Sequence, residues 1–334
     1  MANLKEIRNR IGSVRSTRKI TSAMSRIAAA RLRKAQMAME SARQYGERMA
    51  GITGEILREL DAQSGAGLEH PLLSTNSRQK AVAIIAVTAD RGLCGGFNSA
   101  VNRAVERQVK MLWAEDREVY LVTVGRKGRD YLKSYNRAGR AKNIAHHAAP
   151  AKPEEVVDIA KLVALEAMAL FRGNFVVDSG EREDSDADDA GEAKSTLRVG
   201  EVRLVFNYFR NVITQEVHDD RLLPVPVPEP VDEDGDGQPD PARPAVAHAI
   251  RAFEPDLGQM LDHLLPVAVE TAVQQALYNS VASEVAARRS AMDSATDNAT
   301  ELIGELTLQY NRERQAAITK ELMEIIGGAE ALKG

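Results

Sequence analysis

The first candidate for chemistry is a glycine-rich loop, residues 92–96 (GLCGG), that follows a continuous apolar run at 81–87. A glycine loop after a strand can cradle a phosphate, but this one lacks the GxGxxG order and the terminal GK[ST] of phosphate-binding loops. The alternative is a tight turn from a strand to a helix that requires glycine. Cys94 lies in the loop without a nearby histidine to activate it as a nucleophile, so we favour the turn.

A second candidate is an acidic segment with the spacing of a calcium loop. Asp232, Asp234 and Asp236 stand at positions 1, 3 and 5 of such a loop, and Gly237 stands at position 6. Position 12 is Arg243, where an EF-hand has a bidentate glutamate, and no helical pattern flanks the segment. A solvated acidic loop is the favoured interpretation, and a calcium site is the weaker alternative.

The histidines and basic residues suggest no further active centre. His146 and His147 are adjacent, so they point apart on any regular element, and no other ligand stands at metal spacing. Residues 1–43 are basic but hold no aromatic residue to stack on bases, and the basic side chains recur around the whole predicted helix. Without an acid/base pair or a triad, the sequence predicts a protein that is not an enzyme and needs no cofactor, metal or nucleic acid.

Composition narrows the class of protein. The chain has 334 residues, of which 44% are hydrophobic, enough for a real core. Its single cysteine excludes an internal disulfide, and no apolar run approaches the roughly 18 residues of a membrane-spanning helix. The net charge of −4 conceals an asymmetry, because residues 1–50 are strongly basic while 178–192 and 229–240 are acidic. Without these two acidic stretches the rest of the chain is basic, and a basic protein surface requires acidic partners or solvent.

The two ends of the chain each predict one long helix. Apolar and small residues recur in steps of three, four or seven over about 3–60 and again over about 256–328. The first seam comprises Leu4, Ile7, Ile11, Val14, Thr21, Ala28, Ala35 and Met39, and the second comprises Leu261, Leu265, Ala268, Ala272, Ala276, Met292, Ala295, Ala299, Leu302 and Leu306. We predict that these helices pair as an antiparallel coiled coil within one chain. A dimeric coiled coil is the alternative.

The middle of the chain predicts an α/β domain. Strands are expected at 81–87, 119–124, 201–209 and 211–217, with helices at about 98–113 and 154–172. Strands that alternate with helices favour a doubly wound, Rossmann-like sheet. The predicted organisation is a helix at 1–60, the α/β domain at 78–225 with an acidic insertion at 178–196, a second acidic insertion at 226–247, and a helix at 256–330.

Three separated blocks resemble the gamma subunit of F-type ATP synthases. They are RIGSVRSTRKITSAMSRIAAARLRKAQ at 10–36, TADRGLCGGFN at 88–98, and the segment 282–332, which contains the signature ITKELMEIIGGA. The resemblance implies the central-stalk rotor, whose rotation couples ion flow through a membrane c ring to ATP synthesis or hydrolysis in a hexamer of alpha and beta subunits. It also implies contact with an epsilon subunit, one copy per complex, and a peripheral position at the cytoplasmic face of a bacterial inner membrane.

The resemblance assigns partner contacts to particular positions. Those expected to meet the hexamer are Met24 and Arg26 on the first helix, Cys94 with its loop, and Arg314, Gln315 and Thr319 on the last helix. Phe253 and Glu254 match the foot that meets the c ring and the epsilon subunit. Chloroplast-type relatives carry a thiol-regulated insertion near 226–247, but this chain has no cysteine there, so redox control is not implied.

Two rival functions stay open at this point. One is a stand-alone coiled-coil scaffold with an α/β head, and the other is a nucleotide-binding α/β enzyme that uses the glycine loop. The insertion at 226–247 is either a tolerated surface loop or an electrostatic latch on rotation. Co-purification with partner subunits separates the rotor from the scaffold, and titration with ATP tests the enzyme.

Overall fold

The structure is a computed structural model that describes residues 4–64, 70–74, 79–177, 195–226 and 257–331. The chain forms two compact units. The helical unit comprises Met1–Leu32, Leu93–Gly95 and Val285–Gly334, and the sheet unit comprises Arg33–Gly92 and Gly96–Glu284. Helix α1 (Leu4–Ser64) and helix α5 (Leu257–Ala331) each contribute residues to both units.

In the helical unit, α1 and α5 run antiparallel. Ile7 and Ile11 of α1 are buried together with Leu306 of α5. Further along α1, the Thr21 hydroxyl lies 2.7 Å from the hydroxyl of Thr296. Residue numbers increase along α1 as those of the contacting residues on α5 decrease, so the two helices are antiparallel. The predicted coiled coil within one chain is confirmed.

The same two helices also pack within the sheet unit. Gly46 of α1 lies so close to Gln275 of α5 that any side chain at position 46 would displace the Gln275 amide. Leu261, Leu265 and Ala276 of the predicted stripe are buried. Between them the prediction is wrong by one position, because Ala272 is exposed while Val269 and Val273 are buried. A face with β-branched residues buries more apolar surface than the alanines would.

The sheet unit contains a five-stranded sheet in the order β3-β2-β1-β6-β7. Its first four strands in this order are parallel, and β7 pairs antiparallel with β6. The strands are β1 (Val82–Val87), β2 (Val119–Val124), β3 (Lys142–His147), β6 (Glu201–Phe209) and β7 (Gln215–Leu223). The α/β sheet is thus confirmed, with an antiparallel edge strand.

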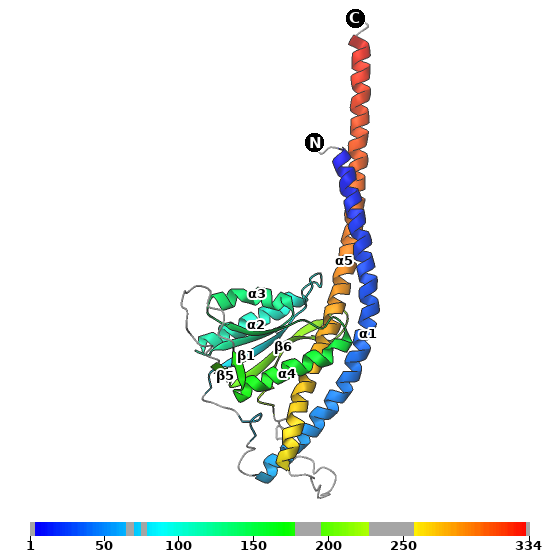
Figure 1. Cartoon of the computed structure of the whole chain (residues 1–334). Coiled ribbons are helices and arrows are strands. Elements are labelled where there is room, and N and C mark those ends of the chain that lie inside the picture. Colours follow the sequence, from blue (N-terminus) through cyan, green and yellow to red (C-terminus); the bar gives the residue numbers. More distant parts are fainter. Residues whose placement is uncertain (1–3, 65–69, 75–78, 178–194, 227–256, 332–334) are drawn as a thin grey trace, which may run out of the picture. The chain divides into compact units, whose positions relative to one another are not determined.

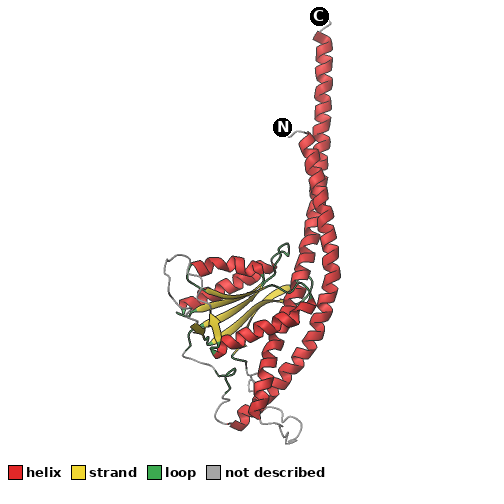
Figure 2. Cartoon of the chain, in the orientation of Figure 1, coloured by secondary structure: helices red, strands yellow, loops and turns green. Residues whose placement is uncertain are grey.

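Helices cover both faces of this sheet, as Figures 1 and 2 show. Helices α2 (Phe97–Ala114) and α3 (Arg126–Arg137) lie on one face, and α4 (Val156–Arg172) lies on the other, after a short 3-10 turn at Pro153–Glu155. A separate two-stranded ribbon joins β4 (Phe175–Val177) to β5 (Ser195–Leu197). Every residue of β1 is buried, as expected for a strand covered on both sides.

The last strand begins four residues later than predicted. Residues 211–214 turn the chain instead, because the Asn211 carboxamide oxygen accepts hydrogen bonds from the backbone N–H groups of Ile213 and Thr214. This side chain offers the backbone a turn in place of a sheet ladder. The apolar residues at 212 and 213 therefore lie in a hairpin, and Ile213 is 85% exposed.

A tight crossing fixes the carboxyl ends of β1 and β2. The Thr88 hydroxyl donates to the carbonyl of Val124 at 3.0 Å and accepts from the N–H of Gly128 at 2.9 Å. Gly125 has φ +96°, and a Cβ placed on it would lie 2.3 Å from the Thr88 carbonyl oxygen. Only glycine fits where the two chains cross.

We predict that Gly125→Ala destabilises the fold by about 3 kcal/mol, because it adds both a backbone clash and an unfavourable φ. Gly139→Ala is the matched control, since Gly139 also has positive φ but nothing lies within 4 Å of its added Cβ. The control should cost roughly 1–2 kcal/mol. Urea unfolding followed by circular dichroism measures both, and equal losses would contradict the crossing.

Candidate functional site

The carboxyl-terminal part of α5 extends past the start of α1 (Figure 1). Every side chain described from Lys320 to Gly328 is exposed. The three residues singled out by sequence, Arg314, Gln315 and Thr319, are exposed as well. The Thr319 hydroxyl donates to the Gln315 carbonyl at 2.9 Å, so these two residues share one face of the helix. This end of the chain presents a helical surface with no neighbour among the described residues.

An apolar stripe runs along this bare helix. Ile318, Leu322, Met323, Ile325 and Ile326 are each more than half exposed. The steps of four and three from Ile318 through Leu322 to Ile325 place these three on one face. Exposed apolar stripes of this kind mark contact surfaces for another protein. The sequence analysis did not identify this stripe, although the spacing of these residues is present in the sequence.

The α1 side of the helical unit has a mixed surface. Arg26 is exposed and Met24 is half-buried, while Ile20 and Ile27 are 60% and 55% exposed. The other exposed charged residues of this stretch are basic except for Glu6, and the basic ones are Lys5, Arg8, Arg10, Arg15, Lys19 and Arg31. Such a helix favours partners with negative charge and small apolar recesses.

Polar side chains interrupt the seam between the two helices. The Ser25 hydroxyl donates to the Asp293 carboxylate, and Arg289 lies 3.8 Å from the same carboxylate. Together with the Thr21–Thr296 contact, this forms a polar layer between α1 and α5. A polar layer in a coiled coil fixes the register of the helices at some cost in stability.

The glycine-rich loop serves as a strand-to-helix turn. Leu93 and Gly95 have φ +62° and +55°. A Cβ on Gly95 would lie 3.7 Å from Cβ of Ala291 and 3.9 Å from the Ala287 carbonyl oxygen, so the loop backbone packs on α5. Cys94 is 2% exposed, and Leu93 is the exposed side chain at 64%. This geometry favours the turn over a phosphate cradle.

Hydrogen bonds hold the chain on either side of this turn. The Asn98 carboxamide oxygen accepts from the N–H of Ala89 at 2.9 Å, which ties the start of α2 to the end of β1. The Asp90 carboxylate accepts from the N–H of Arg126 at 2.9 Å, at the first residue of α3. A carboxylate there satisfies an unpaired donor and favours the positive end of the helix.

The adjacent histidines point in different directions, as predicted. The His146 ring contacts the Thr123 hydroxyl at 3.1 Å, and the His147 ring contacts the Glu166 carboxylate at 2.8 Å. Burial, with a smaller effect of Arg129, lowers the pKa of His146. Within the described ranges, no three His, Cys, Asp or Glu side chains are placed to hold a metal ion.

Several predicted site residues lie outside the described residues: Phe253, Glu254, Asp232, Asp234 and Asp236. The calcium loop and the foot contact therefore stay predictions. None of the helices in the described part of the chain is long and apolar enough to cross a membrane.

Comparisons with known proteins agree along the whole chain. A family model described as ATP synthase matches residues 3–332. The ATP synthase gamma chain of Geobacter metallireducens is 43% identical over 339 residues, covering 100% of both chains. That of Phenylobacterium zucineum is 40% identical over 332 residues, covering 99% of this chain and 100% of the relative.

Solved structures share the fold. A chain from the central stalk and c-ring structure of the Tetrahymena thermophila mitochondrial ATP synthase matches with a TM-score of 0.51 at 23% identity, covering 83% of this chain and 99% of that one. A chain from the Euglena gracilis mitochondrial ATP synthase matches with a TM-score of 0.50 at 18% identity, covering 91% of this chain and 95% of that one.

We predict that Thr21→Cys combined with Thr296→Cys, in a Cys94→Ser background, forms a disulfide within one chain under mild oxidation. The two hydroxyls are 2.7 Å apart, which brings the Cβ atoms near disulfide range. The matched control pairs Ile20→Cys with Thr296→Cys, because Ile20 faces solvent. Non-reducing electrophoresis should show a crosslinked monomer for the first pair alone, and a crosslinked dimer would contradict the pairing.

Proposed function

This chain belongs to the ATP synthase gamma chain family, and from that premise we propose how its surfaces act in the enzyme. It is the central-stalk rotor subunit of an F-type ATP synthase, which couples ion flow to ATP synthesis or hydrolysis by rotation. The observation that carries the proposal is the helical unit, where a coiled coil ends in a single helix with an exposed apolar stripe. The other surfaces complement this end.

The bare end of α5 acts as the upper bearing of the rotor. Its apolar stripe turns within a sleeve formed by the hexamer of alpha and beta subunits, where apolar contact without directional hydrogen bonds lets the helix rotate. Arg314, Gln315 and Thr319 lie just before or beside the stripe and are exposed, so they are free to contact loops of the catalytic subunits. The polar residues provide contacts that depend on the rotor angle.

The basic face of α1 acts as the pushing surface. Arg26 and the half-buried Met24 lie on this helix, where they face the moving domains of the catalytic subunits. Long-range attraction between basic side chains and acidic partner loops varies with angle, so rotation changes which catalytic site is engaged. Each site then shifts among states of different affinity, as any partner with unequal affinity for two states shifts an equilibrium.

The chain itself makes no ATP in this proposal. The glycine loop is used for a packed turn, and Cys94 is buried within it. The loop contributes to the hexamer contact through its exposed surface at Leu93. Catalysis therefore belongs to the alpha and beta subunits, and this chain supplies the asymmetry.

The remaining partners are the c ring and the epsilon subunit, with one copy of this chain per complex. The complex stands at the cytoplasmic face of a bacterial inner membrane, to which this chain is peripheral. Phe253 and Glu254 are proposed for the foot contact on the strength of their resemblance to the family. The proposed contact with the c ring is supported by the fold that this chain shares with a chain from the central stalk and c-ring structure.

A pull-down from native membranes tests the proposal. With this chain as the bait, the pull-down should recover the alpha, beta and epsilon subunits in one complex with ATP hydrolysis activity. Recovery of this chain alone would favour a stand-alone scaffold. Titration of the isolated chain with ATP distinguishes the third function, since measurable heat of binding would favour a nucleotide-binding enzyme.

We predict that Arg314→Ala and Gln315→Ala each cause a several-fold fall in coupled ATP turnover by the assembled complex. Each removes the side chain proposed to hydrogen-bond to a partner, and a typical hydrogen bond contributes about 0.5–1.5 kcal/mol. Both side chains are exposed, so circular dichroism and thermal unfolding of the chain should not change.

Arg312→Ala is the matched control, because Arg312 is an exposed arginine on the same helix that the family resemblance does not assign to a contact. Its turnover should stay at the wild-type level. Unchanged turnover in both test variants would show that the partner contacts lie elsewhere on α5.

A further inference from the structure

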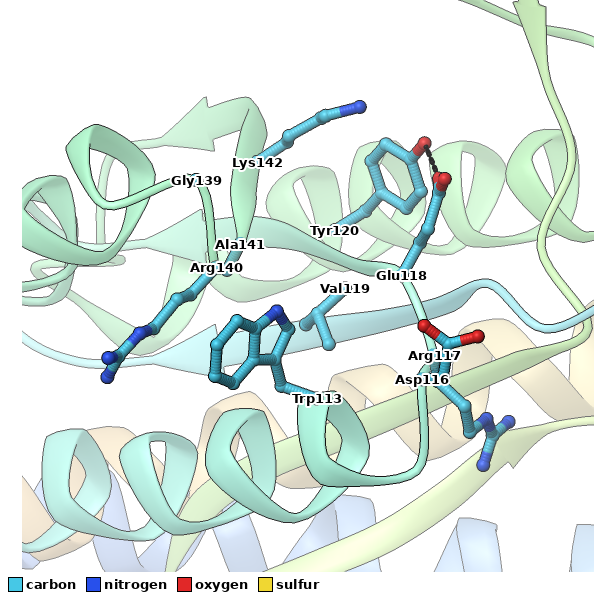
Figure 3. A pocket seen from close by; sticks show the side chains of 10 residues that line it. All are labelled: Trp113, Asp116, Arg117, Glu118, Val119, Tyr120, Gly139, Arg140, Ala141 and Lys142. Carbon is cyan, nitrogen blue, oxygen red and sulfur yellow. Dashed lines mark hydrogen bonds between the residues drawn. The ribbon is translucent and has the colours of Figure 1, made fainter.

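A small pocket lies at the edge of the sheet where β2 begins (Figure 3). Its volume is about 190 Å³, and it opens where α2 ends and where β2 and β3 begin. Trp113 and Tyr120 supply its aromatic walls, and Arg140 and Lys142 supply positive charge. Trp113, the chain's single tryptophan, is 54% exposed. Tryptophan is enriched at contact surfaces because it offers both a large apolar ring and an N–H donor.

Two cations in this pocket lie over the aromatic rings. The Arg140 guanidinium is 4.9 Å from the centre of the Trp113 ring, and the Lys142 ammonium is 5.6 Å from that of Tyr120. Stacking of this kind holds a cation in place while its outer side stays available to an anion. Neither cation has a carboxylate partner within the described part of the chain.

The other charges around the pocket are already paired. Arg117 binds the Glu201 carboxylate at 3.0 Å, and Asp116 binds Lys80 at 3.3 Å. The Tyr120 hydroxyl donates to Glu118 at 2.7 Å, and burial together with that carboxylate raises the pKa of Tyr120 to about 12. Arg140 and Lys142 are thus the charges left to recognise a ligand, which must be anionic.

The chain itself supplies an anionic segment near this edge. Residues 178–194 lie outside the described residues, but their anchors are Val177 at the end of β4 and Ser195 at the start of β5. Eight of residues 178–192 are acidic and one is basic. The chain reaches β6 only four residues after β5 ends, at Glu201, which pairs in register with Val82 of β1.

The distances between the anchors and the pocket suit this segment. Val82 also pairs with Val119, so β6, β1 and β2 all begin at the edge where the pocket lies. Adjacent strands are about 4.8 Å apart, which places β2 about 10 Å and β3 about 14 Å from β6. Seventeen residues that leave and return can reach up to about 28 Å from their anchors.

We propose that the acidic segment 178–194 docks onto the Trp113–Arg140–Lys142 face, with its carboxylates on the two cations. Charge complementarity and the short tether together favour this occupant over a partner protein, because a tethered segment has a high effective concentration. The docked segment covers the exposed Trp113 ring. Screening by salt weakens the contact, since both cations are solvent-exposed.

Trp113 fluorescence in the purified full chain tests the proposal, because it is the chain's only tryptophan. In the test variant, the eight acids of 178–192 become Asn or Gln at constant length. We expect acrylamide quenching of Trp113 to rise about twofold at low salt, since exposed ion pairs are weak and docking is partial. High salt should raise the wild type to the same level, and a synthetic 178–194 peptide should restore protection to the variant.

Matched variants separate docking from local effects. Neutralising the six acids of 229–240 should leave the acrylamide quenching of Trp113 unchanged. In a chain carrying Arg140→Gln and Lys142→Gln, neutralising the acids of 178–192 should cause no further change in this quenching. The same neutralisation should keep its full effect in a chain carrying Arg126→Gln and Lys127→Gln, at the opposite edge of the sheet.

Three results would overturn the proposal. The first is equal quenching of wild type and the variant neutralised at 178–192. The second is an effect of that neutralisation that persists without Arg140 and Lys142. The third is protection of Trp113 only when other subunits of the complex are present, which would assign the pocket to a partner.

Discussion

The fold depends on the antiparallel pairing of the first and last helices of one chain. The strands of the α/β sheet all lie between these two helices in the sequence. The apolar contacts of Ile7 and Ile11 with Leu306 and the polar layer at Thr21 and Ser25 fix the pairing in register. A stalk that transmits torque requires such a fixed register. If the two helices slid past each other, torque applied at one end would not be transmitted to the other.

Unequal helix lengths determine which surface is left for partners. Helix α5 has 75 residues and α1 has 61, and the last turns of α5 have no partner helix among the described residues. A helix end left alone in water would carry polar residues, but this one carries an apolar stripe from Ile318 to Ile326. An exposed apolar stripe of this kind marks a contact with another protein, which supports the proposed place of this end inside the hexamer.

The elements predicted correctly from the sequence are those with a clear hydrophobic pattern. The apolar run at 81–87 and the heptad seams identified the central strand and both long helices. Strand β3 was missed because KNIAHH is polar and only half-buried at the sheet edge, and α3 was missed because few of its residues are apolar. The last strand was displaced by the Asn211 turn, a local hydrogen bond that no hydrophobic pattern reveals. Arg314 and Gln315 came from family resemblance alone, whereas Trp113, Arg140 and Lys142 meet only through the fold.

The most direct test of the central claim is rotation of this chain within its complex. The alpha and beta hexamer is fixed to a surface, and a visible probe is attached to the sheet unit of this chain. ATP should drive stepwise rotation of the probe in one direction, and rotation should stop when a disulfide joins this chain to a catalytic subunit. Continued ATP hydrolysis at the full rate in the crosslinked complex, or hydrolysis without rotation, would contradict the account.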